Sequence, residues 1–190
     1  NFSITTAPNN QLSSSVAYDS VNQSFFVIWE DWRAGTNSDI YGQLVSATGD
    51  FIGGNFSIST APNNQGWRPS TTYDPVNQRY LVAWGDFRSG TTWDIYGQLV
   101  SANGSLFGTD FTISNASNDQ LQTSMAYDPV AQHFLVTWTD SRSGANDIYG
   151  QLVSTTGTLF GPEIPISIAP SYQEESSITY DSVNQRFLAA

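Results

Sequence analysis

The sequence repeats itself, and this internal repetition constrains the fold more than any other feature of the chain. The run Ala/Thr-Tyr-Asp-Ser/Pro-Val occurs four times, and its tyrosines Tyr18, Tyr73, Tyr127 and Tyr180 lie 55, 54 and 53 residues apart. Helical repeats of about 33–47 residues and leucine-rich repeats of about 20–29 residues are shorter than this period. A unit of this length is typical of one blade of a β-propeller, a sheet of four antiparallel strands.

The residue pattern within each repeat predicts four β-strands and no helix. In the first repeat we expect strands at residues 14–18, 25–29, 39–45 and 56–59, which are rich in β-branched and aromatic side chains and are separated by Gly, Asn and Asp. Proline follows the first strand in the second and third repeats, where its fixed φ favours a turn. The fold class predicted is all-β.

The chain is predicted to form a single propeller domain with three full blades and a divided fourth. The predicted units are an outer strand at residues 1–6, full blades at 13–60, 70–114 and 124–168, and a partial blade at 177–190. The first six residues match residues 55–60, so they are assigned to an outer strand. The divided blade then contains its first, second and fourth strands.

Three arrangements of the divided blade follow from this count. The chain closes on itself as a four-bladed ring, or two chains close together with each N-terminal strand completing the partner's last blade. In the third, the chain is a fragment of a longer propeller, cut just before the tryptophan that Trp29, Trp84 and Trp138 represent in the complete repeats. We favour association between chains, because an open copy exposes strand edges and an apolar face.

Each complete repeat carries the motif W-x-D-x-R-(S/A)-G followed by D-I-Y-G-Q-L-V-S. These motifs resemble the repeats of bacterial and archaeal extracellular β-propellers, loosely akin to TolB-type repeats. The resemblance covers essentially the whole chain and implies a fold more sharply than an activity. The sialidase-type motif S-x-D-x-G-x-T-W is absent, which argues against transferring a glycosidase activity.

Composition excludes several classes of function. The chain has no cysteine and one histidine, His133, so disulfides, thiol catalysis and Cys- or His-cluster metal sites are excluded, and we expect no cofactor. The formal net charge is −11 and all six basic residues are arginine, which is unfavourable for binding nucleic acid. No apolar run approaches the roughly 18 residues of a membrane-spanning helix.

The same composition suggests where the protein works. The absence of Cys and Lys, the abundance of Ser, Thr, Asn and Gln, and an N-terminus without a charged-then-apolar leader fit an acidic protein that is extracellular or displayed at the cell surface.

An Asp-x-Arg pair followed by a further Asp recurs between the second and third predicted strands of every complete repeat. One interpretation is a weak Ca²⁺ site, because Ca²⁺ binds several carboxylate oxygens. We favour a structural ion pair, because the arginine would repel a cation and a single active site has no reason to occur three times. The candidate Ca²⁺ ligands are Asp31, Asp39, Asp86, Asp94, Asp140 and Asp147, and the structural arginines are Arg33, Arg88 and Arg142.

Aromatic and amide side chains gather in the loops between the fourth and first strands and between the second and third. In a propeller these loops emerge on one face, where amides bind sugar hydroxyls and aromatic rings stack on C–H faces. The ligand-binding candidates are Trp32, Trp67, Phe87, Trp93, Asn10 and Asn64. The alternative interpretation is solvated loops and packing between blades.

The leading functional prediction is a non-catalytic extracellular binding module, with carbohydrate as the favoured ligand. A second hypothesis is a structural subunit that assembles with itself through the divided blade. A third is a glycan-active enzyme, for which Glu30, unique to the first repeat, is the most distinctive carboxylate. No nucleophile elbow, phosphate loop or metal-ligand spacing is present.

Overall fold

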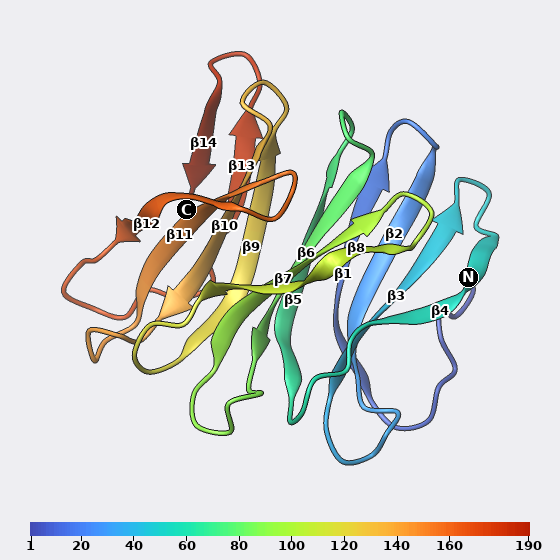
Figure 1. Ribbon diagram of the computed structural model, residues 1–190, viewed down its shortest axis with the longest axis horizontal. Helices are drawn as coiled ribbons and strands as arrows, with labels where there is room; N and C mark the ends of the chain where they lie inside the picture. The colour runs from blue at the N-terminus through green and yellow to red at the C-terminus, as the bar shows by residue number, and fades with distance from the viewer.

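The computed structural model describes all 190 residues, and its regular structure consists entirely of β-strands (Figure 1). Fourteen strands form three four-stranded antiparallel sheets and one two-stranded sheet, each built from strands in chain order. No helix long and apolar enough to cross a membrane is present. We name the sheets blade 1, blade 2, blade 3 and the partial blade.

The strand bounds repeat closely from blade to blade. Blade 1 contains β1 (Gln11–Asp19), β2 (Ser24–Asp31), β3 (Asp39–Ser46) and β4 (Phe51–Ser59). Blade 2 contains β5 (Gln65–Asp74), β6 (Arg79–Asp86), β7 (Asp94–Ser101) and β8 (Leu106–Ser114). Blade 3 contains β9 (Gln120–Asp128), β10 (His133–Asp140), β11 (Asp147–Ser154) and β12 (Leu159–Ser167), and the partial blade contains β13 (Ile178–Asp181) and β14 (Arg186–Ala189).

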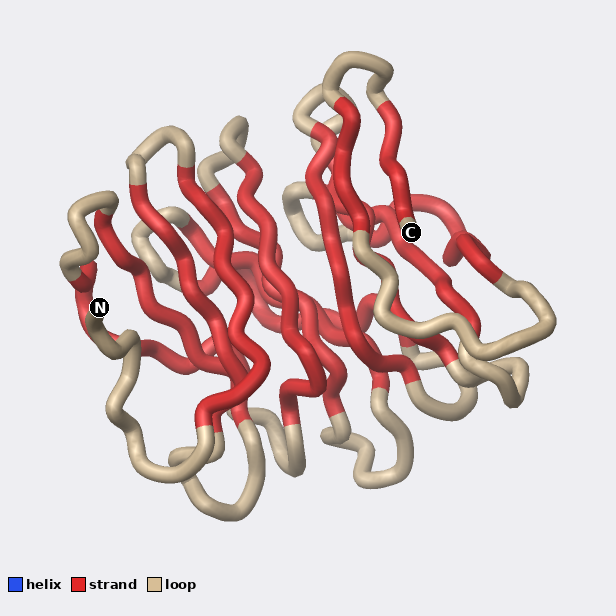
Figure 2. The backbone as a smooth tube through the Cα atoms, turned by 180° about the vertical axis from the view of Figure 1, so that it is seen from behind, coloured by secondary structure: helices blue, strands red, loops and turns tan.

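The sheets stand face to face in a row, with their first strands adjacent and their fourth strands at the outside (Figures 1 and 2). β1 contacts β5, β5 contacts β9, and β9 contacts β13, so the first strands surround a common axis. The termini lie at opposite ends of the row (Figure 1). This radial arrangement is the predicted one, with three full blades and a partial fourth.

The hydrophobic core lies between the blades. Between blades 1 and 2, side chains such as Ile40 and Ile58 pack with the fully buried Trp84, and between blades 2 and 3 the equivalent Ile95 and Ile113 pack with Trp138. Each large apolar side chain buried in this way contributes about 1.5–3 kcal/mol. The second strands β6 and β10 are almost completely buried, as their continuous apolar runs predict.

The fourth strands are longer than the sequence suggests. β4 begins at Phe51 instead of residue 56, and its early residues are exposed. A register shift between Gly42 and Leu44 in the β3–β4 pairing accommodates Gly53, whose φ of 71° lies in the left-handed region that glycine adopts without strain. An outer strand can therefore include a glycine-rich stretch that looks like a loop in the sequence.

The predicted strand at residues 1–6 is not formed. This segment pairs with no strand of the four sheets, so it lacks the backbone hydrogen bonds of a β-strand. The segment is nevertheless placed, because the Phe2 ring packs edge-on against Phe51 at 5.9 Å between centroids.

Candidate functional site

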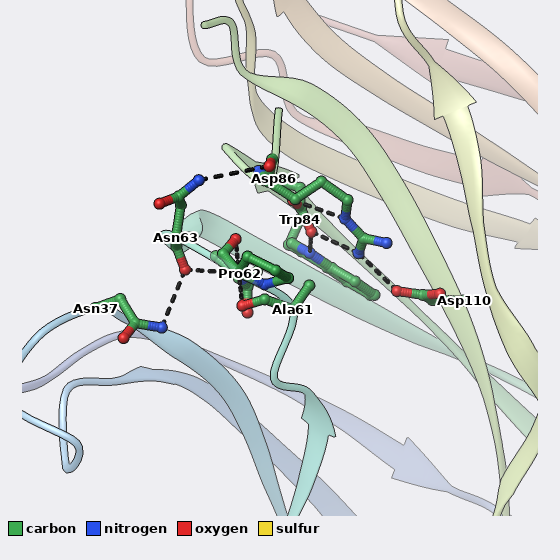
Figure 3. A network of polar contacts seen from close by, with 9 residues as sticks. Asn37, Ala61, Pro62, Asn63, Trp84, Asp86 and Asp110 are labelled. Atoms are coloured by element: carbon green, nitrogen blue, oxygen red, sulfur yellow. Dashed lines mark hydrogen bonds and ion pairs between the residues drawn. The ribbon is translucent and has the colours of Figure 1, made fainter. Parts of the chain in front are cut away.

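The turn after the second strand of each full blade is held by a buried carboxylate. In blade 2, Asp86 accepts the Trp84 indole N–H at 2.9 Å and both Nε and Nη2 of Arg88, at 2.9 and 2.7 Å. Arg88 also binds Asp110 on β8 at 2.6 Å (Figure 3). The guanidinium lies 3.8 Å from the centroid of the Tyr96 ring, so it connects three strands of its blade.

The same contacts between tryptophan, aspartate and arginine occur in the other two full blades. Arg33 pairs with Asp31 and Arg142 pairs with Asp140, and each aspartate accepts the indole N–H of the tryptophan two residues before it. Burial alone would raise the pKa of Asp31, but hydrogen bonds from Arg33 and Trp29 outweigh it and lower the pKa. Both oxygens of each carboxylate are engaged, which gives the three arginines a structural role.

The remaining aspartates of the motif are buried at the start of the third strands. Burial and the neighbouring carboxylate of the same blade raise the pKa of Asp39 and Asp94. Asp147 accepts a hydrogen bond from Ser143. No group of three or more His, Asp or Glu side chains is arranged to hold a metal ion.

The predicted loop aromatics fall into two groups. Trp93 lies between Trp67 and Phe87, with ring centroids 5.5 and 5.2 Å away, so these three rings form one cluster on blade 2. Gly85 lies beside Trp67 and Trp93, and a methyl group at this position would be in van der Waals contact with both, at 3.4 and 3.5 Å. Trp32 belongs to blade 1, where its indole N–H donates to Glu30 at 2.8 Å.

The predicted asparagines connect loops. The backbone carbonyls of Asn10 and Asn64 accept the N–H groups of Trp32 and Phe87 within their own blades. The Asn64 side chain also accepts the backbone N–H of Ser38 in the preceding blade, at 3.2 Å. Beside it, Asn63 accepts from Asn37 and donates to the Arg88 carbonyl (Figure 3). The Asn64 side chain and the Asn63 backbone carbonyl therefore join the loops of blades 1 and 2.

Sequence reasoning missed a set of backbone irregularities at the start of the first strands. Ser13, Arg68, Gln122 and Glu175 occupy equivalent positions in the four repeats, and all have positive φ, between 51° and 62°. Non-glycine residues adopt this conformation at a cost, and such strain concentrates at functional sites. The four side chains at these bulges differ in chemistry, whereas the third strands of the three full blades have identical sequences.

Trp67 is an extra residue in the bulge of blade 2. Gly66 pairs with Gly85 in the sheet register, as Leu12 pairs with Glu30 and Leu121 with Thr139. Trp67 therefore has no counterpart in the other repeats, although its neighbours in the sequence suggest that it corresponds to Leu12 and Leu121. The period of 55 residues between Tyr18 and Tyr73 was the signal for this insertion.

The bulges surround a cleft of about 300 Å³ on the propeller axis. Arg68 forms an ion pair with Glu175 at 2.7 Å, which joins blade 2 to the partial blade across the end of blade 3. A methyl group at Gly66 would lie 2.6 Å from Glu30, so the Glu30 side chain reaches from blade 1 to blade 2. The cleft is lined by Leu12, Ser13, Glu30, Trp67, Arg68 and Gln122.

A larger hollow, of about 550 Å³, lies at the opposite end of the strands. It is lined mainly by polar side chains of the turns and hairpins of blades 1 and 2, among them Asn22, Asn77 and Arg79. Asn22 and Asn77 are equivalent residues that cap their own turns by binding Asp19 and Asp74. The axial cleft is the better candidate site, because it combines side chains that the repeats do not share.

Comparison with known proteins identifies the fold. No family model and no curated protein matches the sequence. Penicillium chrysogenum α-L-arabinanase complexed with arabinobiose is similar in structure, with a TM-score of 0.67 over 94% of this chain at 10% identity. An N-acetylgalactosamine deacetylase from F. plautii in complex with blood group B trisaccharide gives a TM-score of 0.60 over 90% of this chain, also at 10% identity.

The chain folds as a β-propeller. It spans 58% of the length of each of these two similar chains. At this identity the likeness describes the arrangement of the blades, so function has to be argued from the axial cleft itself.

Proposed function

We propose that the protein is a non-catalytic binding module and that its axial cleft binds a neutral carbohydrate. The observation that carries this proposal is the exposed indole of Trp67, which is present in only one repeat and stands beside Glu30, Arg68 and Gln122. A propeller made of near-identical repeats needs no such residue for its fold. Its position beside polar side chains that also differ between repeats indicates a ligand.

The cleft supplies both kinds of contact that a sugar requires. Trp67 is 49% exposed and is braced from behind by Trp93, so it offers a rigid apolar surface for the C–H face of a sugar ring. Glu30 accepts hydrogen bonds, Arg68 donates them and the Gln122 amide does both. Few polar groups around an apolar surface are typical of small-molecule sites.

Charge favours a neutral ligand. The protein carries a formal net charge of −11, and the long-range field of such a surface repels uronic acids and sulfated glycans. Within the cleft the Arg68 guanidinium is paired with Glu175, so it is not available as an unpaired anion-binding group. The sugar complexes named for the two similar structures support a saccharide as the ligand class.

Non-catalytic binding fits the state of the two carboxylates near the cleft. Hydrolysis by paired carboxylates requires one that is held protonated beside an ionised partner. Glu30 accepts the indole N–H of Trp32 and Glu175 pairs with the guanidinium of Arg68, so each carboxylate already has a donor within the protein. The composition that favours an extracellular or cell-surface location also suits a module that meets glycans there.

The test is a glycan array of neutral and acidic oligosaccharides, followed by calorimetry with the best neutral binder. Trp67→Ala is expected to weaken binding at least thirty-fold, equivalent to about 2 kcal/mol. Phe160→Ala is the matched control, because Phe160 is 59% exposed on the outer strand β12, and it should leave binding unchanged. No binding on the array, or equal effects of both substitutions, would contradict the proposal.

The same incubations distinguish binding from catalysis. Mass spectrometry of the oligosaccharides should find them intact after prolonged exposure to the protein. Turnover that is abolished by Glu30→Gln or Glu175→Gln would instead support the hypothesis of a glycan-active enzyme and would contradict the non-catalytic proposal.

A further inference from the structure

The three junctions between neighbouring blades repeat one set of contacts. At each junction the tyrosine of the first strand turns its hydroxyl toward an aspartate of the blade before it, and the pairs are Tyr73 with Asp19, Tyr127 with Asp74 and Tyr180 with Asp128. These three hydroxyls are buried and have no hydrogen-bond partner, and the facing carboxylate of the preceding blade helps to raise the pKa of each tyrosine. Burial and Asp128 raise the pKa of Tyr180 to about 12.

Polar contacts reinforce the junction between blades 2 and 3. The Asn77 amide donates to Gln132 Oε1 at 3.3 Å, which joins the turns that follow the two first strands. The Arg79 guanidinium donates to the backbone carbonyl of Thr155 at 3.0 Å, which joins β6 to the hairpin between β11 and β12. The residues that make these contacts have equivalents at the two ends of the row. Gln23 of blade 1 is equivalent to Gln132, and Asn184 and Arg186 of the partial blade are equivalent to Asn77 and Arg79.

The outer strand of one blade also contacts the outer hairpin of the next. A methyl group at Gly104 would lie 3.1 Å from the Phe56 ring, and one at Gly157 would lie 2.9 Å from the Phe111 ring. Phe2 makes the same contact, since a methyl group at Gly49 would lie 3.1 Å from its ring. Phe2 therefore stands against blade 1 where the outer strand of a preceding blade would stand.

Ile4, like Phe2, occupies the place of a residue from the outer strand of a preceding blade. A hollow of about 230 Å³ beside β1 is lined by Ile4 together with Trp29 and Val27. The equivalent residues Ile58 and Trp84 lie in one core cluster at the junction of blades 1 and 2. The N-terminal segment thus supplies part of a junction on the outward face of blade 1, and the hollow beside it accepts further apolar side chains.

The outward faces of the row carry the two unmatched halves of this junction. On blade 1, Tyr18 and Val16 are 49% and 60% exposed, and Gln23 occupies the position of Gln132.

On the partial blade, Asp181 and Asn184 occupy the positions of Asp74 and Asn77, and Leu188 is 65% exposed. These faces lie at opposite ends of the row (Figure 1), so they do not meet within these 190 residues.

We propose that these faces bind each other head to tail, with the blade 1 face of one copy seated on the partial blade of a second copy. The occupant is a second copy because this face continues the interface that already joins the blades of the chain. Tyr18 then faces Asp181 of the second copy and Gln23 accepts from its Asn184. Its Arg186, equivalent to Arg79, donates to the carbonyl of Ala47, equivalent to Thr155.

Such a contact joins two different surfaces, so it generates a ring or a filament according to the rotation between copies. Residues 1–6 remain packed against blade 1 and supply the outer segment beside β13 and β14 of the second copy. In this contact the partial blade contributes its first and second strands and residues 1–6 contribute the outer segment, whereas the third strand of an internal junction has no counterpart.

Cysteine cross-linking tests the register, and the chain has no cysteine of its own. Gln23→Cys and Asn184→Cys are purified separately and then oxidised alone and as a mixture. A covalent species of twice the 20.8 kDa chain mass is expected in the mixture and not from either variant alone. The double variant Asn77→Cys/Gln132→Cys is the matched control, because it should close the same contact within one chain.

The unmodified chain gives an independent measurement. Light scattering should show a mass above 20.8 kDa that rises with protein concentration, and Tyr18→Glu, which places a carboxylate against Asp181, should return it to the monomer value. A monomer at the highest concentration, together with a control that cross-links and a mixture that does not, overturns the proposal. Cross-linking of Gln23→Cys with itself also overturns it, because that result indicates a face-to-face dimer.

Discussion

The turn after β6 and the bulge at the start of β5 lie close together in blade 2 and follow opposite rules. The turn contains Trp84, Asp86 and Arg88 in an arrangement that blades 1 and 3 copy atom for atom. The bulge contains Trp67 and Arg68, which no other repeat shares. Repetition marks the residues that build a blade, and divergence at a strained backbone position marks the residues that are free to serve a ligand.

The largest effect expected from this comparison is on stability. Trp84→Ala removes a fully buried indole from the core between blades 1 and 2 and leaves Asp86 without one of its donors. We expect a loss of about 3–5 kcal/mol in the free energy of unfolding. Trp67→Ala removes a half-exposed indole and should cost less than about 1 kcal/mol. Urea denaturation followed by circular dichroism measures both, and similar losses would erase the distinction between the two regions.

The next effect separates the two kinds of ion pair. Asp86→Ala leaves the Arg88 guanidinium and the Trp84 N–H without their shared acceptor inside the blade, and should cost about 3 kcal/mol or more. Glu175→Ala breaks an ion pair whose two side chains are 55% and 52% exposed, and should cost less than about 1 kcal/mol. Thermal unfolding of the two variants makes the comparison. Equal shifts in melting temperature would show that the axial pair is also part of the framework.

A deletion sharpens the distinction at the cleft. Removing Trp67 restores the 54-residue spacing of the next repeat and leaves a single left-handed residue in the bulge, as in blades 1 and 3. We expect an unfolding free energy within about 1 kcal/mol of the original and a loss of saccharide binding of at least ten-fold. Calorimetry on the folded variant measures the binding. Retained affinity would mean that Trp67 is a spacer residue.

The sequence predicted the regular part of this molecule well because that part depends on local pattern. Apolar runs with β-branched residues predicted β6 and β10, and the repeated tryptophan in each run is indeed buried between blades. The strand predicted at residues 1–6 failed because strand formation depends on a neighbour, which sequence similarity to residues 55–60 does not supply. The residue pattern of one segment does not show whether a second strand lies in position to pair with it.

The axial cleft was only partly predictable. Trp67 and Trp93 stood out as aromatic residues in variable loop positions, and the structure brings them together. Arg68 and Glu175 are 107 positions apart in the numbering and meet because the first strands of separate blades converge on one axis. Long-range pairs of this kind follow from the curvature of the whole row, which no local window of sequence contains.

The smallest effect concerns pH and distinguishes two aspartates of the same repeat. Asp31 has a pKa below its ordinary value in the folded protein, so its contribution to stability is present above the unfolded pKa and is lost as pH falls through the lower, folded pKa. Asp39 has a raised pKa, caused by burial and the nearby Asp31 carboxylate, so its ionised form is disfavoured by folding. The contribution of Asp39 therefore lowers the stability of the protein as pH rises from the pKa of Asp39 in the unfolded chain through its higher pKa in the folded protein.

Asp39→Asn should therefore stabilise the protein at pH 7 by up to about 1 kcal/mol, and the gain should shrink at pH values below the ordinary aspartate pKa of about 3.9. Asp31→Asn should show the reverse, a loss at pH 7 that narrows only at more acidic pH. Urea denaturation across a pH series measures both differences against the original chain. If Asp39→Asn is destabilising at pH 7 by as much as Asp31→Asn, then both carboxylates belong to the repeated framework, and the division between them within the motif is wrong.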